Sequence, residues 1–255
     1  MRPVAVITGG GSGIGAATAA RLVGDGFDVV VTGRRQERLD AVAATLDGHA
    51  RAVAMDVADL ASVTVATVEI GRCDVLVNNA GGALGADPVE GADPADWRGT
   101  LETNVIGTLQ VTQALLPALR RSPRATVVTL TSTAADITYP GGGGYTAAKH
   151  AEHALVETLR LELNGSHVRV VEICPGMVHT EEFSVHRFGG DQSRADAVYE
   201  GVDRPLTAED VAECVAFCVR LPQHVNVDRL VVKPVAQAAQ HVLHRGPIDW
   251  GEGDA

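Results

Sequence analysis

The segment GGGGYTAAKH, residues 141–150, contains two residues whose types and spacing suit proton transfer. Tyr145 and Lys149 are four positions apart, so a helix would place them one turn apart on the same face. An unperturbed phenol has a pKa of about 10 and exchanges its proton poorly at neutral pH. A nearby ammonium favours the phenolate. The pair is therefore a candidate acid/base, with a packing role for Tyr145 as the alternative.

A hydroxyl that could accompany this pair follows the run ATVVTLTS, residues 125–132. Ser132 stands at the carboxyl end of the strand expected there, and in doubly wound sheets this end faces the ligand crevice. The hydroxyl could hold a substrate oxygen. The alternative is that Ser132 is only a turn residue.

The glycine-rich stretch TGGGSGIG, residues 8–15, follows the first expected strand and opens a helix. Glycines allow a tight turn and a close approach of the backbone to a ligand. A helix N-terminus offers free N–H groups and a positive dipole end to phosphate. This context predicts a dinucleotide site, with a purely structural turn as the alternative.

The end of the second expected strand indicates which dinucleotide would bind. NAD sites place an acidic residue there for the ribose 2′-hydroxyl, whereas this chain has Arg34 and Arg35. Guanidinium groups favour a 2′-phosphate, so the pattern predicts NADP(H) rather than NAD(H). Two surface arginines at a solvated helix start are the alternative. Asp56, after the third strand, could accept from the adenine amino group.

These residues require an α/β scaffold, and the chain of 255 residues has the pattern of one. Short apolar runs alternate with Ala-rich helical stretches, as in a doubly wound parallel sheet whose strands are buried on both faces. The expected strands are Val4–Thr8, Asp28–Thr32, Ala50–Met55, Asp74–Val77, Thr126–Thr131, Val168–Ile173 and Arg229–Val232. A helix is expected from about Gly144 to Asn164, and Thr207-x-x-Asp210 predicts another near Ala208.

Composition narrows the classes of partner. The formal charge is −11 without a Lys/Arg block, which disfavours nucleic acids and anionic membranes as partners. No apolar run is long enough to span a bilayer, and the N-terminus lacks a signal-peptide pattern, so we expect a soluble cytoplasmic protein. The four cysteines are expected to be free thiols. Cys214 and Cys218 are four positions apart, so a helix would place them on the same face. We expect both thiols to be buried among apolar side chains rather than to bind a metal.

Two segments near the C-terminus lack clear periodicity. Residues 180–204 contain Gly189-Gly190 and are expected to form a mobile lid over the site, or a disordered surface loop. Residues 246–255, GPIDWGEGDA, are expected to be a flexible tail. The domain is accordingly expected to span residues 1–245.

Taken together, the motifs resemble the short-chain dehydrogenase/reductase family in its single-domain form, to about residue 235. The matching residues are TGGGSGIG, NNAG at 78–81, Asn104 in TNVIG, Ser132, Tyr145-x-x-x-Lys149 and PGMVHT at 175–180. The resemblance implies a Rossmann-like sheet of about seven strands with helices on both faces. It also implies that Tyr145 is the acid/base, that Ser132 orients the substrate oxygen and that Lys149 binds the nicotinamide ribose. Asn104 would hold a water in a proton relay.

The resemblance extends the cofactor site along the whole crevice. Asn79 and Gly81 would line the adenosine and ribose side, and Val178 and Thr180 would contact the nicotinamide carboxamide. The full set expected to bind NADP(H) is Gly9, Ser12, Gly13, Ile14, Gly15, Arg34, Arg35, Asp56, Val57, Asn79, Ala80, Gly81, Tyr145, Lys149, Pro175, Gly176, Val178 and Thr180.

A narrower resemblance concerns the substrate. TGRRQERL, DVLVNNAGGALG and EEFSVHRF resemble the NADP-dependent 3-hydroxy acid dehydrogenases, which act on serine, allo-threonine and related small acids. Arg187 could then bind a substrate carboxylate, or be only a surface arginine. The segment Thr133–Asp136 departs from that group. The resemblance also implies a homo-oligomer, a tetramer with a dimer as the alternative, packed through helices near 100–120 and 145–164.

The resulting hypothesis is an NADP(H)-dependent oxidoreductase of a small hydroxy or carbonyl substrate, such as a 3-hydroxy acid or its semialdehyde. One alternative is an enzyme of the same chemistry acting on a bulkier polyketide, steroid or sugar. Another is a dinucleotide-binding protein without catalytic activity.

Overall fold

The computed structural model describes residues 1–251 and has one central sheet of seven strands. The strands are β1 (Val4–Thr8), β2 (Asp28–Gly33), β3 (Ala50–Ala54), β4 (Val75–Asn78), β5 (Thr126–Leu130), β6 (Arg169–Pro175) and β7 (Arg229–Val232). All neighbouring strands of this sheet pair in parallel. The fold predicted from the sequence is confirmed.

The strand order β3-β2-β1-β4-β5-β6-β7 fixes where a ligand crevice can form. Strand β2 lies beside β1 and β3 lies beside β2. The chain then crosses over, and β4 lies on the other side of β1. Between β1 and β4 the connections leave in opposite directions, and this switch point opens a crevice at the carboxyl ends of the strands.

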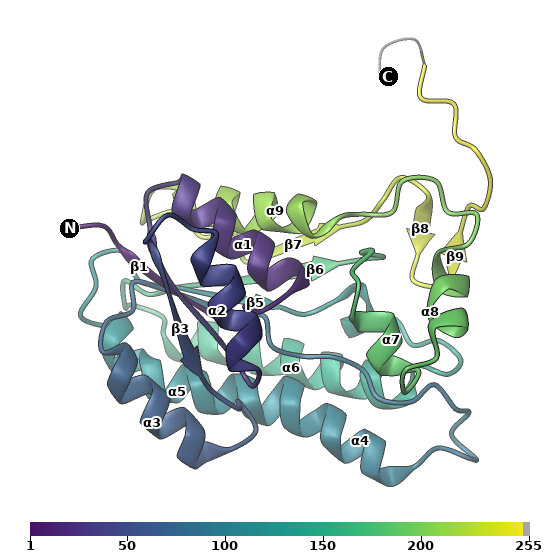
Figure 1. Cartoon of the computed structure of the whole chain (residues 1–255), viewed down its shortest axis with the longest axis horizontal. Coiled ribbons are helices and arrows are strands. Elements are labelled where there is room, and N and C mark those ends of the chain that lie inside the picture. Colours follow the sequence, from purple (N-terminus) through teal and green to yellow (C-terminus); the bar gives the residue numbers. More distant parts are fainter. Residues whose placement is uncertain (252–255) are drawn as a thin grey trace.

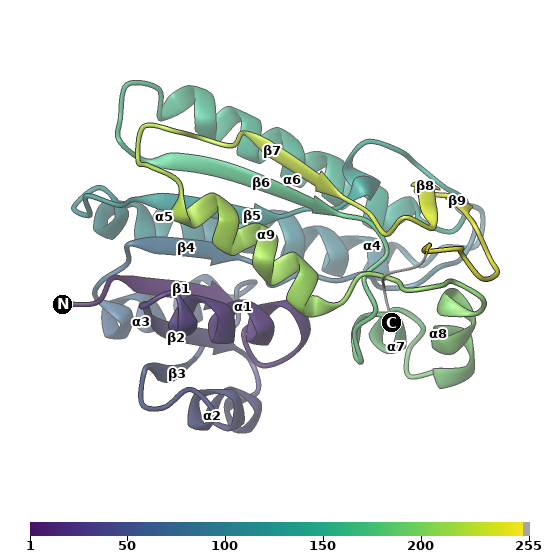
Figure 2. The same cartoon turned by 90° about the horizontal axis from the view of Figure 1, so that it is seen from above.

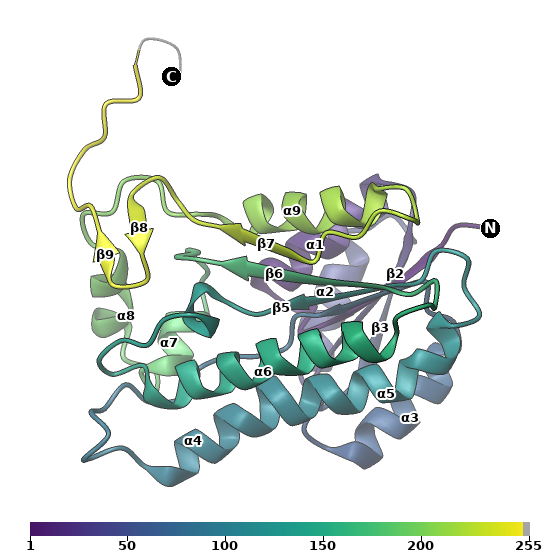
Figure 3. The same cartoon turned by 180° about the vertical axis from the view of Figure 1, so that it is seen from behind.

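Helices cover both faces of the sheet (Figures 1 and 3). On one face lie α1 (Gly13–Gly24), α2 (Gln36–Ala44) and α9 (Ala208–Arg220), and on the other lie α3 (Leu60–Ile70), α5 (Gly107–Leu119) and α6 (Gly143–Glu162). The strands between them are nearly continuous apolar runs because each face contributes to a separate core. Every residue of β4 and β5 is buried.

Short elements gather beyond the carboxyl ends of the strands (Figure 2). Residues 180–204, the segment expected to form a lid, contain α7 (Phe183–Arg187) and α8 (Gln192–Tyr199), and a hairpin of β8 (Gln237–Ala239) and β9 (Val242–Leu243) lies nearby. A 3-10 turn, η2 (Thr133–Ala135), follows β5. Helix α4 (Pro94–Leu101) continues through a π-helical turn, η1 (Glu102–Ile106), into α5. None of the helices in residues 1–251 is long and apolar enough to cross a membrane.

The helix ends follow the local sequence. Thr207 and Asp210 form the predicted capping box at the start of α9, each side chain bonding to the other residue's backbone N–H. α6 ends at Glu162, two residues before the Asn-Gly pair expected to stop it, and Gly165 has a φ of +84°.

The first part of the expected tail contacts the loop after α8. Trp250 Nε1 and the Ile248 backbone N–H both donate to Asp203, at 2.9 and 3.0 Å. Gly246 forms a bridge with Val202. Residues 252–255 lie outside the described residues.

Candidate active site

A cleft of about 1000 Å³ opens at the switch point. Its wall combines the β1–α1 turn, the start of α2, the loops after β4 and β6, the end of β5, the N-terminal half of α6 and the lid. All the residues expected to bind the cofactor line it except Gly15, and Ser132 and Arg187 line it as well. Among residues 1–251, no group of three or more His, Cys, Asp or Glu side chains could hold a metal ion.

The glycine turn forms the floor of the cleft. Gly9 and Gly13 have φ values of +64° and +49°, a region that L side chains rarely adopt. Gly15 has a different reason to be glycine: a Cβ there would lie 2.3 Å from the Gly9 carbonyl oxygen. Gly15 therefore allows α1 to lie close to the glycine turn, and it does not itself line the cleft.

Asn79 joins the loop after β4 to this turn. Its Nδ2 donates to the carbonyl oxygens of Thr8 and Gly9, at 2.9 and 3.2 Å, and its backbone N–H donates to Thr8 Oγ1. Asp56 lines the same end, with one carboxylate oxygen accepting from the Ala58 N–H at 3.0 Å. Asn79 thus ties the loop after β4 to the glycine turn, while the bond of Asp56 stays within the loop after β3.

Three arginines lie with Glu182 in the cleft wall. Arg34 is exposed on the cleft, and Arg35 donates from Nη2 to Glu182 Oε2 at 2.6 Å. Arg38, one turn further along α2, lies 3.6 Å from Glu182 Oε1. The Ser12 hydroxyl also donates to Glu182, at 2.8 Å, rather than capping α1. The hydrogen bond from Arg35 outweighs partial burial and holds the pKa of Glu182 at about 2.

The other end of the cleft holds the expected acid/base pair. Tyr145 and Lys149 occupy successive turns of α6, with Lys149 Nζ 5.9 Å from the Tyr145 ring centroid. Tyr145 is 9% exposed and packs edge-on against Phe183 of the lid, with the ring centroids 5.7 Å apart. Ser132 lines the same end, and its hydroxyl accepts from the Ala134 N–H at 3.1 Å. Ser132 is therefore both the cap of η2 and a cleft residue.

Lys149 has two protein partners. Its Nζ donates to the Leu130 carbonyl at 3.0 Å and to Glu152 Oε2 at 2.6 Å. Burial lowers the pKa of Lys149, but the charges of Glu152 and Tyr145 and the bond to Glu152 together outweigh it, and the net shift is upward. An ammonium has three N–H donors, so these two bonds leave one for a ligand.

Asn104 lies beside the cleft but does not line it. The side chain is fully buried in η1 and binds Gly82 through both its amide nitrogen and its oxygen, at 2.9 and 3.2 Å. The nitrogen also donates to the Thr100 carbonyl at 2.7 Å. The side chain thus shapes the loop after β4, and a part for Asn104 in a water relay remains a prediction.

Arg187 reaches the cleft from α7. It donates to the Tyr139 hydroxyl at 3.2 Å and to the Gly141 carbonyl at 2.9 Å. Its guanidinium carbon lies 5.6 Å from the centroid of the Tyr139 ring. Within residues 1–251, Arg187 Nε is buried without a hydrogen-bond partner. A guanidinium with an unsatisfied buried N–H beside a cleft is suited to binding an anion.

Comparison with known proteins agrees with this geometry. The model of the short chain dehydrogenase family matches residues 3–187, and the chain therefore belongs to that family. An uncharacterized oxidoreductase of Mycobacterium tuberculosis is 53% identical over 236 residues, covering 92% of each chain. Serine 3-dehydrogenase of Agrobacterium fabrum is 40% identical over 93% of this chain and 96% of that one, and sulfoacetaldehyde reductase 2 of Chromohalobacter salexigens is 41% identical with the same coverage.

A solved structure shares the whole fold. The closed form of a serine dehydrogenase complexed with NADP⁺ superimposes with a TM-score of 0.89 at 36% identity. The match covers 95% of this chain and 99% of that chain.

The structure also adds residues that the sequence analysis missed. Arg38 and Glu152 stand three positions after Arg35 and Lys149, and helical spacing could have identified both. Glu182 and Tyr139 join the site from segments without periodicity, where spacing carries no signal. Gln237, from the hairpin, accepts from the Met177 N–H at 2.8 Å and fixes the loop after β6.

Proposed function

We propose that the protein is an NADP(H)-dependent oxidoreductase acting on a small hydroxy or carbonyl substrate. The observation that carries this proposal is the arrangement of the cleft, with arginines at one end and the Tyr145–Lys149 pair at the other. When bound, the cofactor would supply or accept the hydride. Glycines at positions 9 and 13 leave room for close approach, and a carboxylate already occupies the anion-binding end.

The residues of the chain have separate tasks in this proposal. Tyr145 gives its proton to the substrate oxygen in reduction and takes it back in oxidation. Ser132 holds that oxygen, while the remaining N–H of Lys149 binds the nicotinamide ribose. Arg34, Arg35 and Arg38 would bind the 2′-phosphate. The face of Tyr145 not covered by Phe183 is left for the substrate.

The substrate we favour is a small 3-hydroxy acid or the matching semialdehyde. Arg187 supplies a cation next to Tyr139 within the cleft, and its Nε is an unsatisfied donor. Relatives named serine 3-dehydrogenase and sulfoacetaldehyde reductase support a small anionic substrate.

A panel of substrates tests the proposal. Serine, allo-threonine and other small 3-hydroxy acids are assayed with NADP⁺ and NAD⁺, and bulky ketones with NADPH, by the absorbance of the reduced nicotinamide. We expect turnover of at least one small acid, with NADP⁺ preferred. Turnover of bulky neutral ketones alone would replace this substrate class by the alternative. Binding of NADPH without any turnover would favour a catalytically silent protein.

We further propose a cytoplasmic homo-oligomer, either tetrameric or dimeric, without a nucleic-acid or membrane partner. Ile106 in η1 and Leu109 in α5 are exposed apolar residues on the surface expected to pack in the oligomer, and Leu161 is exposed near the end of α6. The formal charge of −11 supports the exclusion of polyanionic partners.

A further inference from the structure

A buried carboxylate lies directly behind the acid/base pair. Glu152 is 1% exposed and stands one turn after Lys149 on α6. Its Oε2 accepts from Lys149 Nζ at 2.6 Å, and its Oε1 accepts from the Thr108 hydroxyl of α5 at 3.1 Å. Glu152 does not line the cleft, so it acts on the site through Lys149.

Other charged groups face this pair from β6 and β7. Glu172 of β6 is fully buried and raises the pKa of Glu152, while Cys174 of β6 lies near Lys149. Glu172 has its own partners, His153 Nδ1 at 2.8 Å and Arg229 Nε at 3.3 Å. The counter-charge of Lys149 is therefore Glu152, and that of Glu172 is Arg229.

The two partners in this ion pair stabilise each other's charge. Burial raises the pKa of Glu152, and the opposing effects of Lys149 and Thr108 reduce this shift but leave it upward. An isolated buried carboxylate would neutralise, whereas an ammonium at 2.6 Å and a hydroxyl donor both favour its ionised form. Proton uptake or loss by the site thus involves three coupled groups, Tyr145, Lys149 and Glu152.

We propose that Glu152 is a positioning residue that holds Lys149 and balances its charge, and thereby sets the pH range in which the Tyr145–Lys149 pair exchanges its proton. This inference rests on the proposed oxidoreductase function. Glu152 and the Leu130 carbonyl orient Lys149 so that its third N–H points to a ligand.

The net charge of Tyr145, Lys149 and Glu152 determines in which direction the half-maximal pH should shift. With Glu152 ionised, loss of a proton from the pair takes the three groups from neutral to a net negative charge. In Glu152→Gln the same loss takes them from positive to neutral, which is easier in a buried site. The pH of half-maximal oxidation should therefore fall in the variant, by about one unit or more for a charge removed within a few ångströms.

The test compares pH–rate profiles for oxidation by wild type, Glu152→Gln and Glu162→Gln, with NADPH binding measured separately by fluorescence. Glu162 is an exposed glutamate at the end of the same helix and is the matched control. We expect a lower half-maximal pH in Glu152→Gln alone, and restoration toward wild type in Glu152→Asp. A purely structural role would lower the rate at every pH and leave the half-maximal pH unchanged, which would overturn the inference.

A second variant keeps the inference falsifiable if Glu152→Gln does not fold. Thr108→Val removes the hydroxyl donor of the carboxylate and leaves the carboxyl group itself in place. Glu152 would then protonate more readily, and the half-maximal pH should fall by a smaller amount. An unchanged profile in Thr108→Val would contradict the proposal. A wild type that binds NADPH but turns over no substrate would instead contradict the proposed function.

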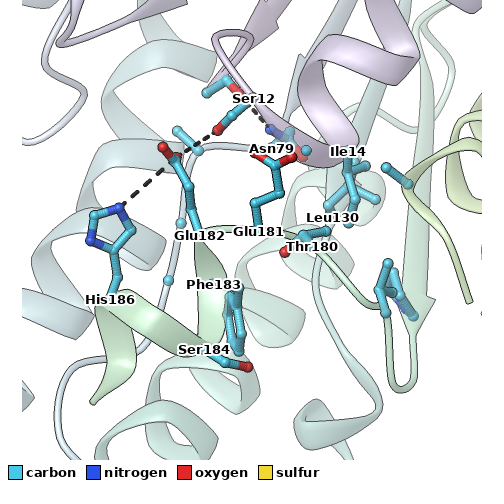
Figure 4. A pocket seen from close by; sticks show the side chains of 18 of the residues that line it. Ser12, Ile14, Asn79, Leu130, Thr180, Glu181, Glu182, Phe183, Ser184 and His186 are labelled. Carbon is cyan, nitrogen blue, oxygen red and sulfur yellow. Dashed lines mark hydrogen bonds and ion pairs between the residues drawn. The ribbon is translucent and has the colours of Figure 1, made fainter. Parts of the chain in front are cut away.

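An independent observation concerns Glu182, at the phosphate end of the cleft. Figure 4 shows its carboxylate between Ser12 of the glycine turn and His186 of the lid. It accepts from Ser12 Oγ at 2.8 Å and from Arg35 Nη2 at 2.6 Å, and lies 3.6 Å from Arg38. The next residue, Phe183, packs on Tyr145. One short segment thus contacts both ends of the cleft.

We infer that Glu182 is a cofactor-specificity residue that competes with the cofactor's phosphate for Arg35 and Ser12. A 2′-phosphate carries more charge than a carboxylate and can displace it, whereas NADH has no such group. The inference rests on the proposed preference for NADP(H). Displacement of Glu182 would also move Phe183, so that binding of the phosphate alters the cover over Tyr145.

Fluorescence titration of wild type, Glu182→Gln and Glu181→Gln with NADPH and NADH tests this inference. Glu181 is an adjacent, exposed glutamate that also lines the cleft and is the matched control. We expect Glu182→Gln to bind NADPH several-fold more tightly than wild type, with a smaller change for NADH. Unchanged or weaker NADPH binding in Glu182→Gln would overturn the inference. A wild type without preference for NADPH would overturn the proposed function instead.

Discussion

At the scale of single residues, local charges determine what the cleft can bind. The chain carries a formal charge of −11, yet Arg34, Arg35 and Arg38 gather at one end of the cleft. Anions at short range respond to such local groups because salt screens charges beyond about 10 Å. The pairing of Arg35 with Glu182 shows that this end already holds an anion.

Arg34→Ala combined with Arg35→Ala should weaken NADPH binding by at least about tenfold, since each charge-assisted bond contributes about 1.5–3 kcal/mol. NADH binding should change much less because NADH lacks the 2′-phosphate. Fluorescence titration with both cofactors measures the two effects. Arg121→Ala, in an exposed arginine after α5, is the control. Equal weakening for NADPH and NADH would contradict the phosphate assignment.

Contacts between residues close in sequence could be predicted from the sequence, whereas contacts between residues far apart in sequence could not. Tyr145 and Lys149 share a helix, so their spacing alone placed them together. Glu182 meets Ser12 across 170 positions of sequence, and no local pattern reports such a contact. The bonds between Asn104 and the Gly82 backbone likewise join positions 22 apart, and a part for Asn104 in a proton relay stays a prediction.

At the scale of elements, the junction of β1 and α1 requires the backbone of α1 at Gly15 to lie close to the backbone of the glycine turn at Gly9. α1 is held from behind by α9, which carries the capping box of Thr207 and Asp210. Its N-terminus faces the cleft, and Ser12 there bonds to Glu182 instead of capping the helix. The N-terminus of α1, the positive end of the helix dipole, therefore lies beside the Glu182 carboxylate.

Gly15→Ala should impair NADPH binding because the new Cβ would lie 2.3 Å from the Gly9 carbonyl, a backbone atom that must move. Overpacking of this kind costs about 1–3 kcal/mol. Gly24→Ala is the control in the same helix, where a Cβ would meet no described atom within 4 Å. Titration and thermal melting should show a loss for Gly15→Ala alone. Equal binding by both variants would contradict the role assigned to this junction.

The main elements of the fold were predictable, and the segments around the cleft were not. The buried strands and the helix from Gly143 to Glu162 have strong apolar patterns, so they can be recognised from the sequence. The lid helices α7 and α8 have five and eight residues, too short to be stable or recognisable without tertiary contacts. The π-helical turn η1 depends on insertion into a longer helix, which composition does not reveal.

At the scale of the whole molecule, the sheet order places both ends of the site in one crevice. Residues from β1 to the β8–β9 hairpin contribute to the cleft, so the complete fold is needed to form it. The two cores lie on opposite faces of the sheet and leave its carboxyl edge free for loops. α5 and α6, on one of these faces, form the surface that we propose for assembly.

Light scattering during size-exclusion chromatography should give four times the chain mass of 26.5 kDa, or twice that mass for the dimeric alternative. Ile106→Asp combined with Leu109→Asp should yield a smaller species, because charges would be buried at the proposed interface. Val65→Asp, at an exposed position of α3, is the control. A monomeric wild type, or an unchanged mass in the double variant, would contradict this assembly.

The most direct test of the central claim is turnover by Tyr145→Phe, measured beside its NADPH binding. The variant keeps the ring that packs on Phe183 and loses only the hydroxyl that exchanges a proton. We predict a folded protein that binds NADPH as wild type does, with turnover reduced by about 10²–10⁴-fold or more, the usual contribution of acid/base catalysis. Turnover equal to that of wild type would contradict the proposed role of Tyr145 and the mechanism built on it.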